Sequence, residues 1–181
     1  FVEEPKEVEW KPTEVKAVQK ALTKLAKDPE NEISVIYVSL LFLTLRRQNE
    51  LLELTWKQIN FQKKLMTDVK IKMYQRLGKR TFELDTPTLE HLKRLKTLTG
   101  DTKWLFPSDK KSGEHRGYFK NFWGKIQEES GVEHTMHDIR HYGSRVMKEL
   151  GVDLDSMAYI MGHKTRLCFL GFMERVMQEP D

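Results

Sequence analysis

Three of the six histidines in this 181-residue chain fall within one stretch of twelve residues, HTMHDIRHYGSR, where arginines lie between them. The stretch contains His134, His137, Arg140, His141 and Arg145. Side chains of these types can bind a metal ion, line a charged surface or surround a phosphate group. The rest of the sequence has to decide between these three kinds of site.

A metal site needs further ligands at suitable spacing, and the sequence offers few. His137 and His141 are four residues apart, but there is no HExxH motif, no paired CxxC motif and no nearby carboxylate with a clear ligand spacing. We therefore expect no metal and no cofactor. On spacing alone, surface or capping roles are the simplest interpretation of these histidines.

The composition is that of a soluble globular protein. Hydrophobic residues make up 39% of the chain and charged residues 32%. The longest apolar run, residues 33–45, is shorter than the roughly 18 residues of a membrane span, and the polar N-terminus does not resemble a signal peptide. The single cysteine, Cys168, excludes an internal disulfide and fits a reducing compartment. A net charge of +4 permits nucleic-acid binding without requiring it.

Apolar periodicity predicts an α+β domain that is mostly helical. Helices are expected at residues 11–29, 33–45, 50–59, 86–98, 118–131, 136–151 and 153–163, with Thr86 and either Asp153 or Asp155 as caps and a helical C-terminal tail. Residues 64–73 alternate between polar and apolar side chains and are joined to residues 80–85 by a turn at Gly78. This pattern predicts a small antiparallel β-hairpin, or a three-stranded sheet if residues near 61–66 take part.

Three motifs, taken in order, resemble the catalytic domain of the tyrosine recombinases and phage integrases. The first is LRRQNELLELTWKQI, which includes Arg47, Glu50, Leu54 and Trp56. The second is HDIRH, beginning at His137, and the third is MGH, ending at His163. The family patterns are R-x-x-E-L-L-x-L-x-W, H-x-L-R-H and L-G-H, so Ile139 and Met161 replace two leucines here. The resemblance extends from about residue 11 to residue 175.

The resemblance implies that this protein cleaves and rejoins DNA strands. Enzymes of this family attack the scissile phosphate with a tyrosine hydroxyl and form a 3′-phosphotyrosyl intermediate, which conserves the bond energy. By this resemblance, Arg47 and Arg140 correspond to the two arginines whose guanidinium groups bind the phosphate in the family's pocket. His137 and His163 become hydrogen-bond donors or proton-transfer groups. On this interpretation, the clustered histidines and arginines converge on one phosphate.

Supporting roles in this pocket follow from the same resemblance. We expect Glu50 to hold Arg47 in place and His141 to buttress the pocket. Arg46 is an alternative clamp, but the match at the positions after it favours Arg47. His134 and Arg145 are expected to be surface residues or further phosphate contacts.

The family also uses a lysine of the β-hairpin as the general acid for the leaving 5′-oxygen. Lys72 ends the first expected strand, 25 residues after Arg47. Lys70 lies on the same strand face and Lys79 lies across the turn, so both remain alternatives. The turn itself departs from the family's Lys-Thr-Gly pattern, because this chain has KMYQRLGKR there.

The largest departure from the family is at the nucleophile. Phe172 stands nine residues after His163, where the family has tyrosine, and no tyrosine follows Tyr159, which lies in an expected buried helix. Phenylalanine keeps the ring but lacks the attacking oxygen, so we expect no cleavage by this chain. An engineered Tyr→Phe substitution is favoured because the other pocket residues are retained. The alternative is a native relative that binds DNA without cutting it.

The resemblance further implies an organisation and partners. Residues 1–181 would form the catalytic domain, without the family's N-terminal core-binding domain and with a C-terminal tail truncated after Phe172. The expected partners are double-stranded DNA and further copies of the protein, as a tetramer on DNA, with no membrane. We expect a cytoplasmic, nucleoid-associated protein of prokaryotic, viral or mobile-element origin. The DNA target and the outcome of recombination do not follow from the sequence.

Overall fold

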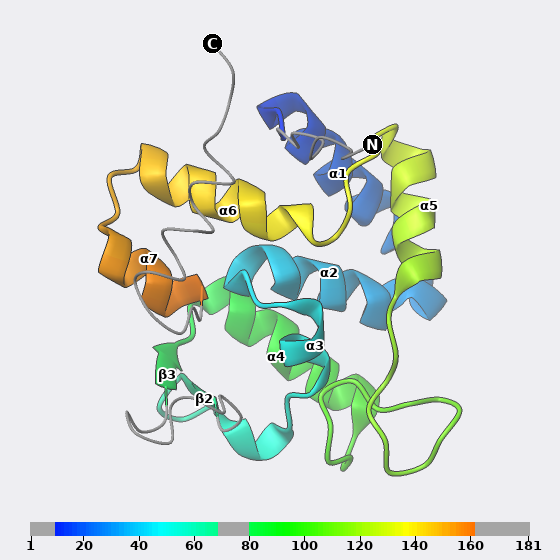
Figure 1. The fold of residues 1–181 in the computed structure, drawn as a ribbon. Coiled ribbons are helices and arrows are strands. Elements are labelled where there is room, and N and C mark those ends of the chain that lie inside the picture. Colours follow the sequence, from blue (N-terminus) through cyan, green and yellow to red (C-terminus); the bar gives the residue numbers. More distant parts are fainter. Residues whose placement is uncertain (1–9, 69–79, 162–181) are drawn as a thin grey trace, which may run out of the picture.

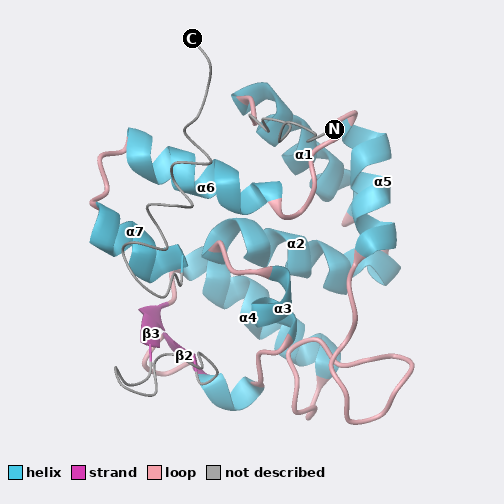
Figure 2. Ribbon diagram, viewed as in Figure 1, coloured by secondary structure: helices cyan, strands magenta, loops and turns pink. Residues whose placement is uncertain are grey.

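The computed structural model describes residues 10–68 and 80–161 of the chain. In this part it contains three strands, seven α-helices and two short 3₁₀ helices (Figure 2). They are α1 (Pro12–Leu25), η1 (Pro29–Asn31), α2 (Glu32–Thr44), α3 (Gln48–Leu52), η2 (Trp56–Gln58), β1 (Ile59–Asn60), β2 (Leu65–Asp68), β3 (Arg80–Glu83), α4 (Thr86–Thr99), α5 (Lys120–Ser130), α6 (Asp138–Glu149) and α7 (Leu154–Met161). The expected α+β fold, mostly helical with a small antiparallel sheet, is confirmed.

Helix α2 occupies the centre of the molecule (Figure 1). Helix α6 lies along one side of it and α4 along another, while α1 packs on α5 and α7 packs on α6. The apolar run of the sequence forms α2, whose buried side chains include Ile36, Tyr37, Val38, Leu40 and Leu41. A helix that is apolar on nearly every side is typical of a buried core position. Within the described residues, no helix is long and apolar enough to cross a membrane.

The sheet has the strand order β1-β2-β3, and both pairs are antiparallel. Met66 lies opposite Ile59 on one side and opposite Phe82 on the other. The three-stranded alternative is therefore correct for the described part of the chain, although the third strand is Ile59–Asn60 and not a strand near residues 61–66. Residues 69–73 of the first predicted strand, and the turn at Gly78, lie outside the described residues.

One helix prediction fails over much of its length. The predicted helix 50–59 is wrong in its second half, because α3 ends at Leu52. From there the backbone bonds to a distant loop instead: the N–H of Leu105 donates to the carbonyl of Leu54 at 3.0 Å, and that of Trp56 donates to the carbonyl of Lys103 at 3.1 Å. These tertiary hydrogen bonds replace the bonds that a continued helix would form.

Two capping predictions have different outcomes. Thr86 is not the cap of α4: the Asp85 carboxylate accepts from the backbone N–H of Thr88 at 2.9 Å, and Thr86 is the first helical residue. At the other helix, Asp153 is the cap rather than Asp155, since its Oδ1 accepts from the N–H of Ser156 at 2.9 Å. A carboxylate in the cap position satisfies one of the unpaired donors of the first turn.

The buried side chains form two clusters that meet near the end of α2. The main cluster spans α1 to the start of α6, and the second consists of Met147, Met157, Ala158 and Met161. Leu45, the residue directly after α2, packs against both. The same residue lies two positions before Arg47, so the junction of the two clusters is also where the first motif begins.

Candidate functional site

Arg140 connects the second motif to the first. This residue of α6 is only 3% exposed. Its Nη1 donates a hydrogen bond to the carbonyl of Leu45, and its Nη2 donates to the carbonyl of Met161 at 2.8 Å. Although Arg47 and Arg140 are 93 positions apart in the sequence, the Arg140 guanidinium therefore reaches the segment that carries Arg47. It also fixes Met161, which is both the last residue of α7 and the first residue of the third motif.

Arg47 directly precedes α3, in the N-cap position, and is held there by Glu50. The backbone of Arg47 is extended, with φ −64° and ψ 145°, and its N–H donates to Glu50 Oε2 at 3.3 Å. Its Nη1 donates to Glu50 Oε1 at 2.8 Å. One carboxylate thus caps the helix and orients the guanidinium. The Arg47 side chain is 43% exposed, so an external anion can approach it.

The neighbouring Arg46 has the opposite environment. It is 5% exposed, and its guanidinium carbon lies 4.9 Å from the centre of the Phe82 ring of β3. This geometry is a cation–π contact, which anchors the sheet to the segment between α2 and α3. Of the two adjacent arginines, the one that faces solvent is Arg47.

His137 and His141 lie at the start of α6, on the same helix as Arg140. His137 is exposed, and the two imidazole rings are 5.3 Å apart at an angle of 74°. The first turn is fixed by buried Asp138, whose carboxylate accepts from the N–H and the hydroxyl of Thr135 at 2.6 and 2.7 Å. This contact holds His137 one turn before Arg140. An anion bound beside His137 would therefore lie at the N-terminus of α6, where the first backbone N–H groups have no partner within the helix.

Several predicted site residues lie outside the described part of the chain. These are Lys72, with its alternatives Lys70 and Lys79, and the two C-terminal positions His163 and Phe172. The structure accordingly brings Arg140 to the Arg47 segment and leaves the convergence of the remaining residues as a prediction. Among the described residues, no group of three histidine, cysteine or carboxylate side chains is arranged to hold a metal ion.

The two other basic residues of the opening stretch pair with carboxylates. His134 Nε2 lies 3.1 Å from Glu14 Oε2 of α1, and its ring stacks on Trp10 at a centroid distance of 4.8 Å. Arg145 Nε donates to Glu149 Oε1 at 3.0 Å. In this arrangement His134 joins α1 to the loop before α6.

Tyr159 was expected to be buried, and this expectation is wrong. The residue is 44% exposed, and its hydroxyl donates to the carbonyl of Thr81 in β3 at 2.7 Å. Its ring lies 5.4 Å from that of Phe82. Tyr159 is on the outer face of α7, where it packs against the sheet rather than the core.

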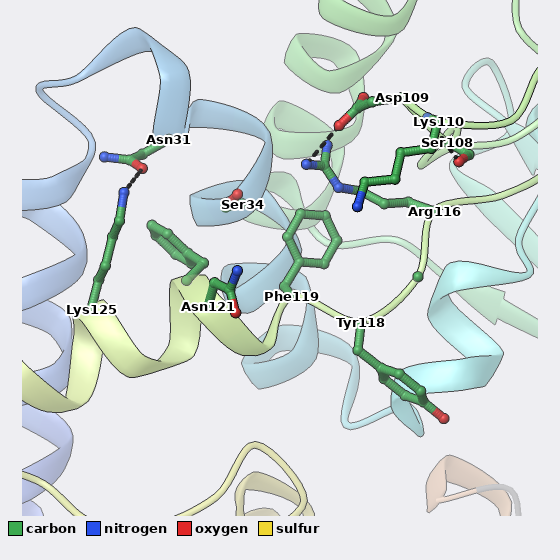
Figure 3. A pocket seen from close by; sticks show the side chains of 12 residues that line it. Asn31, Ser34, Ser108, Asp109, Lys110, Arg116, Tyr118, Phe119, Asn121 and Lys125 are labelled. Atoms are coloured by element: carbon green, nitrogen blue, oxygen red, sulfur yellow. Dashed lines mark hydrogen bonds and ion pairs between the residues drawn. The ribbon is translucent and has the colours of Figure 1, made fainter.

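A polar hollow of about 440 Å³ was not anticipated from the sequence. It lies between the start of α2, the loop 108–117 and the start of α5 (Figure 3). Its lining includes Lys110, Arg116 and Lys125, with Asp109 as the single acidic residue. Asp109 accepts from Arg116 at 2.8 Å, so the lining keeps a positive balance. In the sequence, the lysine, arginine and glycine residues of the loop 108–117 are the feature that could have indicated this hollow.

Comparison with known proteins identifies the family. The model of the phage integrase family matches residues 11–166 of the chain. The tyrosine recombinase XerA of Pyrococcus furiosus is 28% identical over 154 residues, which are 81% of this chain and 51% of that protein. The chain thus spans about half the length of this curated relative.

Solved structures share the fold at lower identity. The Tn1549 transposon integrase in complex with transposon right end DNA has a TM-score of 0.74 at 18% identity, covering 94% of this chain and 62% of that chain. A XerA recombinase has a TM-score of 0.71 at 18% identity, covering 96% and 61%. XerH bound to its palindromic difH substrate has a TM-score of 0.69 at 16% identity, covering 92% and 50%. With its helical fold, its three-stranded sheet and a family match over most of its length, this chain belongs to the phage integrase family.

Proposed function

We propose that this chain is the catalytic domain of a site-specific DNA recombinase or integrase. In this proposal Arg47 and Arg140 bind the two non-bridging oxygens of the scissile phosphate. The observation that carries it is the hydrogen bond from Arg140 to the carbonyl of Leu45, two residues before Arg47, in a member of the phage integrase family. The XerH and Tn1549 relatives, which were solved in complex with DNA, support double-stranded DNA as the partner.

The environments of the two arginines suit them to different tasks. Arg140 is buried and hydrogen-bonded to two backbone carbonyls, so its guanidinium keeps its orientation when the phosphate gains charge in the transition state. Arg47 is half-exposed and held by Glu50, so it can meet the phosphate as DNA arrives. His137, exposed at the open end of α6, donates a further hydrogen bond, and His163 completes the pocket. His141 supports His137 through its ring.

The remaining chemistry is assigned to residues outside the described part. Lys72 protonates the leaving 5′-oxygen, with Lys70 and Lys79 as the alternatives. The nucleophile position is Phe172, nine residues after His163. With phenylalanine there, the chain binds DNA and does not cut it, in agreement with a Tyr→Phe substitution in an otherwise retained pocket. No metal takes part, because guanidinium and imidazole groups supply the positive charge.

The test restores the missing oxygen. Because the chain covers about half of its curated relative, the assay uses the full-length protein with Phe172→Tyr. The substrate is a duplex nicked beside the scissile phosphate, so that the cut strand diffuses away and the covalent intermediate accumulates. Denaturing electrophoresis should show a protein–DNA adduct for Phe172→Tyr and none for the Phe172 protein, although both shift the same DNA in a native gel.

The other outcomes have defined meanings. An adduct formed by the Phe172 protein would identify a different nucleophile and overturn the site assignment. Binding without an adduct by Phe172→Tyr favours the second candidate function, a native DNA-binding relative that does not cut. The observation that favours this second function is Phe172 itself, since a family member without the hydroxyl retains only binding.

Assembly and origin follow as parts of the proposal. Strand exchange joins two DNA sites, each bound by two protomers, so we propose a tetramer on DNA. The relatives come from an archaeon and a transposon, which supports a prokaryotic or mobile-element origin and a place in the cytoplasm, on the nucleoid.

A further inference from the structure

Leu45 ends α2 in a backbone conformation that usually belongs to glycine. Its φ is 50° and its ψ is 26°, and its N–H closes the helix by donating to the carbonyl of Leu41 at 3.0 Å. A left-handed conformation brings the Cβ of an ordinary residue close to its own backbone, so glycine adopts it at lower cost. The leucine side chain must therefore contribute something that a glycine would lose.

That contribution is packing between the two buried clusters. The Leu45 side chain contacts the main cluster around α2 and the second cluster formed by Met147, Met157, Ala158 and Met161. It thereby fills the space where α2, α6 and α7 meet. Its size consequently determines how closely α6 can approach the end of α2.

Gly143 of α6 is the residue that faces this side chain. A Cβ added at Gly143 would lie 2.5 Å from Leu45 Cδ1 and 2.9 Å from Cγ, and Cδ2 would be nearer still. Carbon atoms in ordinary contact are about 3.5–4.0 Å apart. Rotation about the last side-chain bond of Leu45 moves the two methyl groups but leaves Cγ in place. Helix α6 thus reaches Leu45 only because residue 143 carries no side chain.

Arg140 lies three positions before Gly143, on the same face of α6. Its guanidinium donates to the backbone carbonyl of Leu45, while Gly143 contacts the side chain of that residue. Both contacts fix α6 against one residue, and Arg47 follows that residue by two positions. A change in the Leu45–Gly143 contact should therefore move Arg140 relative to Arg47.

We propose that Leu45 and Gly143 are a size-matched pair of positioning residues that sets the distance between the Arg47 and Arg140 guanidinium groups. The consequence for catalysis rests on the proposed function, whereas the contact itself does not. The pair touches no substrate. It acts through the place at which Arg140 is held.

The first arm of the test needs no DNA. Gly143→Ala adds one methyl group at the contact, and the matched control Gly124→Ala adds one in α5, where a Cβ meets nothing within 4 Å. The measurements are the midpoint of chemical denaturation and the ¹⁵N resonance of the Arg140 side chain. Gly143→Ala should lower the midpoint and shift the resonance. Gly124→Ala should do neither, and its midpoint should rise, because alanine is the better helix former.

The rescue variant separates a size match from a general loss of stability. Leu45→Ala removes the atoms that the new methyl group would strike. In the double variant with Gly143→Ala, the Arg140 resonance should return toward its original position. A resonance that is unmoved by Gly143→Ala, or equally displaced in the double variant, would show that the two residues are not a matched pair.

The second arm measures the catalytic consequence in full-length protein with Phe172→Tyr. There, Gly143→Ala should slow formation of the covalent adduct by about 100-fold, the typical cost of misplacing a catalytic group by about 1 Å. The DNA dissociation constant should change much less, and the double variant should recover part of the rate. If Phe172→Tyr alone gives no adduct, the proposed function is wrong, but the first arm still tests whether Leu45 and Gly143 are a size-matched pair. If the adduct forms equally fast with Gly143→Ala, the pair does not position the arginines.

Discussion

Adjacent residues of one motif can have opposite roles, and Arg46 and Arg47 show why. The left-handed backbone at Leu45 ends α2, and the chain then turns into α3. After this turn Arg46 points under Phe82, while Arg47 points outward and meets Glu50. Motif spacing already favoured Arg47, and the geometry supplies a physical reason, since an arginine covered by a ring is poorly placed to meet DNA.

The two arginines of the proposed clamp should respond differently to truncation. Arg140→Ala leaves the carbonyls of Leu45 and Met161 without their donor, so we expect the free energy of unfolding to fall by about 2–4 kcal/mol. Arg47→Ala removes a half-exposed ion pair with Glu50, and the expected loss is below about 1 kcal/mol. In the Phe172→Tyr background both variants should lose adduct formation. Urea denaturation and the adduct assay measure the two effects.

Arg140→Lys is the informative control for this comparison. It keeps the positive charge but cannot hold two carbonyls and a phosphate with one planar fork. It should regain part of the stability and little of the cleavage. Full adduct formation by Arg47→Ala or Arg140→Ala would mean that the residue concerned has only a structural role.

At the scale of elements, the sequence predicted most helices because their apolar spacing matches the surface that each one buries. The apolar run that became α2 is an example, and the alternating residues that became β2 are the corresponding case for a strand. The prediction failed where hydrogen bonds to a distant part of the backbone determine the local structure, as after Leu52. It also failed at Tyr159, because the residue spacing of α7 does not reveal that the sheet is its neighbour.

The sequence named candidate residues for the site but not their geometry. Motif order alone selected Arg47 and Arg140, although 93 positions separate them. That Arg140 holds the carbonyl of Leu45 depends on how α6 packs on α2, which no local pattern encodes. A glycine inside a helical pattern can mark a close approach, but the contact of Gly143 with Leu45 emerged only from the three-dimensional structure.

Contacts at the start of α1 should make the free energy of unfolding depend on pH in the acidic range. The pKa of Glu14 is lowered, first by the hydrogen bond from the backbone N–H of Lys11 at 2.8 Å and further by His134. A lowered pKa in the folded state stabilises the protein above the ordinary pKa of 4.5, and this stability is lost as the pH falls through the folded value. Glu14→Gln should therefore lower the free energy of unfolding at neutral pH and flatten its decline below about pH 4.5.

Urea denaturation at a series of pH values measures this effect. Glu128→Gln is the matched control, because Glu128 is an exposed residue of α5 and its loss changes the net charge equally. The control should keep the acid-dependent decline of the parent protein. Parallel curves for Glu14→Gln and the parent would show that the contacts of Glu14 do not contribute to stability.

At the scale of the whole molecule, the modest net charge of +4 hides an uneven distribution. The lining of the hollow at the start of α5 includes three basic residues, Lys110, Arg116 and Lys125, and a single acidic residue (Figure 3). Arg116 is engaged by Asp109 at 2.8 Å, and Lys125 donates to Asn31 at 3.3 Å. Lys110 and Lys125 are both exposed, but among the described residues only the Lys110 ammonium group of the three has no side-chain partner.

If the hollow contacts the DNA backbone, removing Lys110 should change the salt dependence of binding. Each phosphate contact releases condensed counterions, so the slope of log K against log salt steepens by about 0.9 for each contact. Lys110→Ala should therefore weaken duplex binding and reduce the magnitude of this slope by about 1. The measurement is fluorescence anisotropy with the full-length protein at several salt concentrations.

The control for this prediction removes the same charge elsewhere. The Lys24 ammonium is already paired with Glu129 at 2.7 Å. Lys24→Ala therefore changes the net charge equally but should not remove a contact with a DNA phosphate. If net charge alone governed binding, the two variants would weaken it by the same factor. A reduced slope for Lys110→Ala, with the parent slope kept by Lys24→Ala, would place the DNA backbone at the hollow. Equal slopes in both variants would restrict the DNA contacts to other surfaces, including the one around Arg47 and His137.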